Sequence, residues 1–178
     1  RCCVRSVDVT TLMATPSQQA TERFDALYRD AAGDLFAYVV TIVHDRQAAE
    51  DVTHAAFERA YRKQGSYRPG KGSERAWLFG IARNAALDEL RRRKRTATLH
   101  GDPPDPGLPG PADDTAVRRS AVRAAIAALE PRDRELIALK YYAGLNNDEI
   151  ARVLGASASN AGTRLHRAII RLRESCNA

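Results

Sequence analysis

The side chains best suited to do chemistry lie on one face of a segment close to the C-terminus. At helical spacing, one side of the segment after Ser157 carries hydroxyl, amide and basic groups, namely Ser159, Asn160, Thr163, Arg164, His166, Arg167 and Arg171. Groups of these types hydrogen-bond to base edges in the major groove and neutralise phosphates. The chemistry that they predict is the non-covalent recognition of duplex DNA.

Three successive helices would position this face. The first opens at Pro131 and ends at Gly144, because proline suits a first helical position and glycine commonly ends a helix. Asn146 and Glu149 match a capping box that starts the second helix, and Gly155 is the left-handed residue expected after its end. The third is the polar-faced segment itself. Two helices joined by a short turn containing glycine, the second one basic, predict a helix-turn-helix whose recognition helix enters a DNA groove.

A second group of side chains suited to nucleic acid lies in the middle of the chain. The loop 65–73 places Tyr67 between glycines and the cations Arg68 and Lys71. An aromatic ring flanked by cations can stack on a base while the phosphates are neutralised nearby. A long helix over about 74–95 follows the loop and ends in five consecutive cations, which suit a helix C-terminus and could hold phosphates.

The same sequence contains no pattern typical of a catalytic or metal site. Its four histidines are scattered, its three cysteines lack metal-ligand spacing, and no glycine-rich phosphate loop precedes a helix. We therefore expect no catalytic residue, no metal and no cofactor. No apolar run approaches the roughly 20 residues that cross a bilayer, and no signal-peptide core is present. We expect a reduced, cytoplasmic protein without membrane insertion.

Charge and composition divide the chain. Its 178 residues carry a formal net charge of +6, but the basic residues concentrate in 65–100 and 118–178, with an acidic stretch at 101–117 between them. Two separate basic blocks predict two polyanion-facing surfaces. Residues 96–114 hold five prolines, three glycines and four aspartates, a composition that builds neither a helix nor a core.

The predicted architecture is all-α, with two small helical domains joined by a flexible linker rich in proline, glycine and aspartate. Apolar residues at helical spacing predict helices over about 21–43, 47–63, 74–95 and 115–129, before the helix-turn-helix. The resulting boundaries are a flexible N-terminal extension at 1–20, a first domain at 21–96, a linker at 97–114 and a second domain at 115–178.

With these pieces placed, the chain resembles the extracytoplasmic-function (ECF) sigma factors, group 4 of the sigma-70 family, which keep only sigma regions 2 and 4. The resemblance covers about 21–96 and 115–175. It rests on motifs in both parts, namely 49–52, 57–61 and 76–84 for region 2, and 129–135, 144–154 and 164–168 for region 4. This ordered set is more specific than a helix-turn-helix alone.

The resemblance implies roles for individual residues of region 2. Carboxylates on a helix are usually a solvated face, but Glu50, Asp51 and Glu58 match the surface that docks on the β′ clamp helices of RNA polymerase. Asn84 matches the asparagine that helps to hold a base flipped out of the minus-10 strand. The full expected minus-10 set is Tyr67, Arg68, Lys71, Trp77, Arg83, Asn84, Arg91, Arg92 and Arg93.

In region 4 the resemblance assigns minus-35 recognition to Ser159, Asn160, Thr163, Arg164, His166 and Arg167. Two residues of this helix depart from the family pattern, because Gly162 stands where lysine or arginine is usual and Ala161 where valine is usual. Glycine inside a helix costs up to about 1 kcal/mol relative to alanine, and one contact to DNA is lost. We therefore predict a weaker or altered minus-35 preference.

The function implied is transcription initiation without catalysis. Such a factor binds core RNA polymerase through its β′ clamp helices and β subunit, recognises duplex and single-stranded promoter DNA, and is commonly held inactive by an anti-sigma factor. Its acidic linker would run near the RNA exit path. One alternative is a stand-alone helix-turn-helix repressor or activator, which would bind duplex DNA without polymerase. Another is an enzyme acting on nucleic acid, such as a recombinase.

Overall fold

The computed structural model describes residues 16–100, 122 and 124–177, and within them the fold is all-α, as predicted. Most of the expected N-terminal extension, linker and helix 115–129 lies outside these residues. Six helices are defined in full, namely α1 (Pro16–Val43), α2 (Arg46–Lys63), α3 (Glu74–His100), α5 (Pro131–Tyr141), α6 (Asn147–Leu154) and α7 (Ala158–Asn177). Two short 3₁₀ turns, η1 (Gln64–Ser66) and η2 (Pro69–Lys71), lie between α2 and α3.

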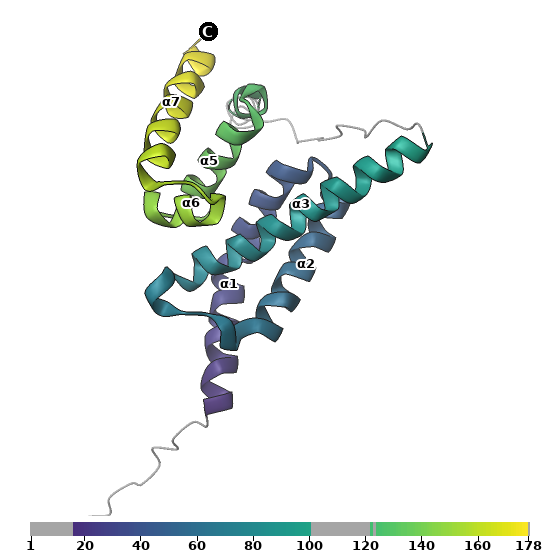
Figure 1. Ribbon diagram of the computed structural model, residues 1–178, viewed down its shortest axis with the longest axis vertical. Helices are drawn as coiled ribbons and strands as arrows, with labels where there is room; N and C mark the ends of the chain where they lie inside the picture. Colours follow the sequence, from purple (N-terminus) through teal and green to yellow (C-terminus); the bar gives the residue numbers. More distant parts are fainter. Residues whose placement is uncertain (1–15, 101–121, 123, 178) are drawn as a thin grey trace, which may run out of the picture.

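The first three helices pack against one another as a bundle (Figure 1). The turn between α1 and α2 depends on His44, which has a positive φ of 56° and donates its backbone N–H to the Val40 carbonyl. Asp45 then caps α2, because its Oδ1 accepts the Ala48 N–H at 2.8 Å. This short connection returns α2 against α1 and buries the apolar face of both helices.

Helix α3 continues to His100, five residues beyond its expected end at Arg95. The prediction placed the end too early because it treated the cationic run as a terminus. Arginine and lysine are good helix formers, and Glu89 pairs with Arg92 at 2.7 Å and with Arg93 at 2.8 Å, one turn further along. These pairs reduce the mutual repulsion of the cations, and the first proline comes only at Pro103.

The second half contains the predicted helix-turn-helix. The Asn146 side chain accepts the Glu149 N–H, and the Glu149 side chain accepts the Asn146 N–H, so the capping box is confirmed. Gly155 ends α6 in the left-handed conformation with φ 67°. Ser157 Oγ then accepts the Asn160 N–H at 3.3 Å at the start of α7. Local signals in the sequence therefore set the geometry of this motif.

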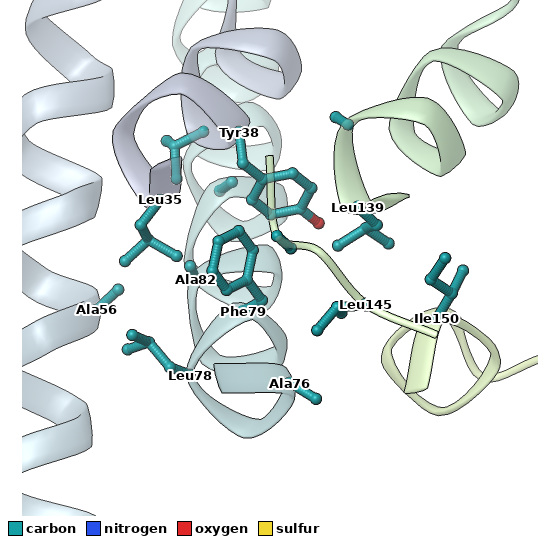
Figure 2. Close-up of a cluster of buried hydrophobic side chains, with 14 of the residues drawn as sticks. Leu35, Tyr38, Ala56, Ala76, Leu78, Phe79, Ala82, Leu139, Leu145 and Ile150 are labelled. Carbon is teal, nitrogen blue, oxygen red and sulfur yellow. The ribbon is translucent and has the colours of Figure 1, made fainter. Parts of the chain in front are cut away.

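The two halves share one hydrophobic core. Helix α5 packs against α1, and α6 packs against α3. Figure 2 shows the buried cluster that joins the halves, in which Tyr38 and Phe79 of the first half lie with Leu139, Leu145 and Ile150 of the second. The ring centroids of Tyr38 and Phe79 are 5.3 Å apart. The composition of the chain did not indicate that the two helical parts pack together.

Candidate nucleic-acid interface

Three residues that the sequence assigned to one DNA element come together around a cavity. Tyr67, Trp77 and Asn84 line a space of about 420 Å³ beside the start of α3. The Tyr67 and Trp77 rings lie 5.8 Å apart between centroids and are inclined at 49°. Asn84 is exposed, two helical turns beyond Trp77. The cavity therefore combines two aromatic faces with an amide that can donate and accept hydrogen bonds.

Loop contacts fix the Tyr67 ring. Its hydroxyl donates to the Gly72 carbonyl at 3.1 Å, which closes the 3₁₀ turn that Pro69 begins. From α1, the Arg23 guanidinium lies 5.4 Å from the ring centroid, and Arg23 also pairs with Glu74 at 3.0 Å. The sequence gave no reason to select Arg23, because 44 residues separate it from Tyr67 and only the bundle brings them together.

Helix α6 supplies a further wall of the same cavity through Glu149, Arg152 and Val153. Glu149 Oε1 accepts hydrogen bonds from the Ser73 N–H at 3.0 Å and from the Ser73 hydroxyl. Burial raises the pKa of Glu149, but the hydrogen bonds from Ser73 and the Asn146 N–H together outweigh it, so the net pKa is lowered. The Glu149 carboxylate is therefore held in its charged form at the edge of the loop.

Arg83 lies away from this cavity and does not face solvent, which corrects the expectation that it points outwards with Asn84. Its Nε donates to Glu135 Oε1 of α5 at 2.7 Å. The same carboxylate oxygen accepts the Tyr38 hydroxyl at 3.1 Å. Burial raises the pKa of Tyr38 well above its usual value, and the Glu135 charge adds to the effect. Arg83 and Tyr38 thus share one acceptor from the opposite half.

Three of the predicted phosphate-binding arginines are paired within their own half. Arg91 contacts Asp88 at 2.9 Å, and Arg93 contacts Asp45 at 3.1 Å in addition to Glu89. Hydrogen bonds from Arg92 lower the pKa of Glu89 despite its partial burial. Because the Arg91 and Arg92 pairs are largely exposed, they hold the side chains only weakly.

Arg75 was not selected from the sequence, yet it has the largest set of partners in this region. It reaches Asp30 at 2.7 Å and Asp34, both on α1. It also donates to the backbone carbonyls of Ala143 at 2.7 Å and Tyr142 at 3.0 Å, which follow α5. Its planar guanidinium allows several donors to act at once, so Arg75 links α1, α3 and the turn before α6.

On α7, the structure leaves most of the predicted minus-35 set accessible. Only Arg164 is half-buried; the exposed members are Ser159, Asn160, Thr163, His166 and Arg167. Arg164 lies 3.7 Å from Asp133, a buried carboxylate in the first turn of α5. A cavity of about 540 Å³ at this point is lined by the cations Arg132, Arg164, Arg167 and Arg171 together with 130–133.

The acidic residues predicted to bind polymerase lie on the outer face of α2. Asp51 and Glu58 are exposed, and Glu50 is half-buried. The opposite face of α2 packs on α1 and α3. Glu50 pairs with Arg46 and Glu58 with Arg62, both within one helical turn. The second half makes its contacts with α1 and α3, so this face stays open.

Two other kinds of site were sought in the part of the chain that the structure describes. There, no group of three or more histidine, cysteine, aspartate or glutamate side chains is arranged to hold a metal ion. Over the same residues, no helix combines the length and the apolar composition needed to cross a membrane.

Comparison with known proteins agrees with this arrangement. Residues 27–96 match the family model of sigma-70 region 2, and residues 119–172 match that of sigma-70 region 4. The ECF RNA polymerase sigma factor SigL of Mycobacterium tuberculosis is 32% identical over 152 residues, which cover 83% of this chain and 85% of the relative. The RNA polymerase sigma factor CarQ of Myxococcus xanthus is 32% identical over 163 residues, covering 86% and 93%.

Solved structures extend the similarity to the arrangement of the halves. The sigma factor RpoE of Bartonella quintana, solved in complex with the anti-sigma factor NepR, matches with a TM-score of 0.77 and 25% identity, over 88% of this chain and 98% of that one. CnrH, solved with the cytosolic domain of CnrY, shares the fold with a TM-score of 0.63 and 23% identity, over 89% and 92%. Both family models and the relatives lead to one conclusion: the chain belongs to the ECF group of the sigma-70 family of RNA polymerase sigma factors.

Proposed function

We propose that this ECF sigma factor captures an unpaired base of the minus-10 element in the cavity formed by Tyr67, Trp77 and Asn84. The observation that carries the proposal is the convergence of these three side chains around one space of about 420 Å³. Stacking on an aromatic ring contributes about 1–3 kcal/mol per base, and extruding a base costs a few kcal/mol. Two rings and one amide are therefore enough to offset most of that cost.

The remaining minus-10 residues would act on the backbone of the same strand. Arg68 and Lys71 line the cavity from the loop, where they are close enough to neutralise the phosphates next to the captured base. Arg91, Arg92 and Arg93 would exchange their exposed carboxylate partners for phosphates further along α3. Each such exchange releases counterions from DNA, so binding should weaken as salt increases.

Helix α7 would read the duplex minus-35 element in the major groove. Hydroxyl, amide and guanidinium groups can each recognise base edges there, and five of the six predicted residues are exposed. Regions 2 and 4 would correspond to 21–96 and 115–178, joined by the linker 97–114. The open acidic face of α2 would dock on the β′ clamp helices of core polymerase, with further contacts to the β subunit.

Two further properties belong to the same proposal. The factor would have no catalytic activity of its own and would act in the cytoplasm, where polymerase and promoters are found. An anti-sigma factor is a proposed partner, because the RpoE chain that matches over most of its length was solved bound to one. The stand-alone repressor hypothesis receives no such support, because it leaves the region 2 match without a role.

The test is core-dependent strand opening. Labelled protein would be titrated against bacterial core RNA polymerase, and open-complex formation would be measured on a pool of promoter fragments. We expect tight association with core, and loss of opening in Tyr67→Ala and Asn84→Ala with association retained. Tyr141→Ala is the control, because Tyr141 is 65% exposed and lies outside the cavity. Sequence-specific binding to duplex DNA without any association with core would contradict the proposal.

A further inference from the structure

Region 4 contacts region 2 through two carboxylates that lie on the same side of the molecule. Glu135 of α5 binds Arg83 and Tyr38, and Glu149 of α6 binds Ser73. We call Glu135 and Glu149 the acidic edge of region 4. Neither carboxylate is explained by the helix-turn-helix alone, although Glu149 also serves the capping box through its second oxygen.

The groups that the acidic edge contacts belong to the surface of region 2 that faces nucleic acid. Arg83 directly precedes Asn84 in α3, and Ser73 ends the loop that carries Tyr67. An arginine and a backbone N–H with an adjacent hydroxyl are typical phosphate ligands. Carboxylate oxygens therefore occupy positions where this surface would otherwise bind the anionic backbone of DNA.

The contact also closes the space around the minus-10 cavity. Arg152 of α6 donates to the Lys71 carbonyl in the same loop, and Val153 lines the cavity beside it. On the other side of α3, Arg83 shares a second cavity of about 310 Å³ with Asn160 and Arg164 of α7. Residues assigned to the two promoter elements thus face each other, although the elements lie apart on a promoter.

These pairs are strong enough to matter because they are shielded. The Arg83 and Glu135 side chains are only 22% and 13% exposed, so solvent screens their attraction less than it screens a surface pair. Fully buried apolar residues lie around them, including Leu139 and Leu145 of region 4 and Phe79 of region 2. Separating the halves would expose that apolar surface as well as break the pairs.

We propose that the acidic edge of region 4 is a docking surface for the nucleic-acid-binding face of region 2, so that the free chain closes on itself and masks its own minus-10 site. The inference rests on the proposed function, because it needs that face to bind promoter DNA. Any partner that requires the open chain must compensate for the lost contacts. The apparent affinity of the free protein for single-stranded DNA is reduced by the fraction of open molecules.

The first measurement is the distance between the halves in solution, without DNA or polymerase. Spin labels would be placed at His54→Cys on α2 and Arg173→Cys on α7, in a full-length chain with Cys2, Cys3 and Cys176 changed to serine. Both labelled positions are exposed. We expect one narrow distance distribution for the otherwise unchanged chain. A broad distribution that extends to long distances would overturn the inference.

The second measurement breaks the docking surface. The double variant E135Q/E149Q removes both charges, and glutamine at 149 can still complete the capping box. We expect a new population at longer distance, and about tenfold tighter binding of the free protein to a fluorescein-labelled pool of random single-stranded 20-mers. Arg83→Gln, which removes the partner in region 2, should lengthen the distance in the same way. If all three variants keep the distance of the parent chain, the acidic edge does not hold the halves together.

Charge alone would also improve DNA binding, so a matched control is required. E22Q/E174Q removes two carboxylates from exposed positions on α1 and α7 and changes the net charge equally. We expect it to alter DNA affinity less than about twofold and leave the distances unchanged. Equal gains in both double variants would overturn the inference. A closed chain that fails to open promoters with core contradicts the proposed function instead, and an open chain that initiates contradicts only self-masking.

Discussion

Asp133 and Arg171 form an ion pair that joins the first turn of α5 to the second half of α7. The carboxylate is buried, with its side chain 6% exposed, and its other oxygen faces Arg164 at 3.7 Å. One buried acid is therefore shared by two arginines of the recognition helix. Their separation of seven residues, about two helical turns, places both on the side of α7 that faces α5.

We predict that Asp133→Asn lowers the free energy of unfolding by about 1.5–3 kcal/mol, the usual effect of losing a hydrogen bond to a charged group. The physical reason is that the amide leaves Arg164 and Arg171 without a balancing charge. Urea denaturation followed by circular dichroism would measure the change. Glu174→Gln, an exposed change on the same helix, should alter stability by less than about 0.5 kcal/mol. Equal midpoints for the two variants would contradict this role of Asp133.

Tyr38 makes stability depend on pH in alkaline solution. Its pKa is raised above the usual value by burial and by the Glu135 charge, so the folded protein holds the phenol proton more tightly than the unfolded chain. The stabilisation is present below the unfolded pKa of about 10 and is lost as pH rises beyond it. Unfolding measured from pH 8 to 11 should show a smaller decline in Tyr38→Phe than in the parent chain. Parallel pH curves would show that Tyr38 does not ionise on unfolding.

His44 has the corresponding effect on the acid side. Burial and the neighbouring Arg134 charge lower its pKa, and Arg134 Nη1 lies 2.7 Å from His44 Nε2. The unfolded chain binds the proton more readily, so stability is complete above pH 6.5 and falls as pH drops below it. His44→Asn should reduce this decline between pH 7 and 5, because asparagine tolerates the positive φ without titrating. An unchanged decline in melting temperature would exclude His44 as its source.

The helix-turn-helix could be predicted because its signals are local. Asn146, Glu149 and Gly155 act on backbone groups within four residues of themselves, so their spacing in the sequence is already their spacing in space. The end of α3 was less predictable. A cationic run is compatible with both a helix terminus and a continuing helix, and the acidic partners of Arg92 and Arg93 decided between them.

The candidate site was only partly accessible from sequence, for a different physical reason. Tyr67, Trp77 and Asn84 lie close together along the chain, and the loop and helix predicted there were enough to group them. Glu135 and Arg83 are 52 residues apart, and nothing local distinguishes a buried acceptor from a solvated carboxylate. Contacts of this kind depend on how α1, α3 and α5 pack, which charge and periodicity do not specify.

Gly162 connects the sequence with the strength of minus-35 recognition, and the structure gives that prediction a test. A Cβ at this position would lie 3.2 Å from the Asn147 side-chain amide, the flexible end of an exposed residue that can move by a few tenths of an ångström. Gly162→Ala should therefore stabilise the protein, by at most about 1 kcal/mol from helix propensity. A lower melting temperature would mean that Asn147 cannot give way.

Gly162→Arg separates the effect on the helix from the effect on DNA. It should gain similar helix propensity and in addition tighten binding of the polymerase complex to promoter DNA, with a salt slope steeper by about one unit for one added phosphate contact. Gly162→Ala is the matched control, because it restores the helix without a charge. If both variants bind promoter DNA with the parent affinity and salt slope, Gly162 does not weaken minus-35 recognition. If both tighten it equally, the loss lies in helix stability and not in a missing contact.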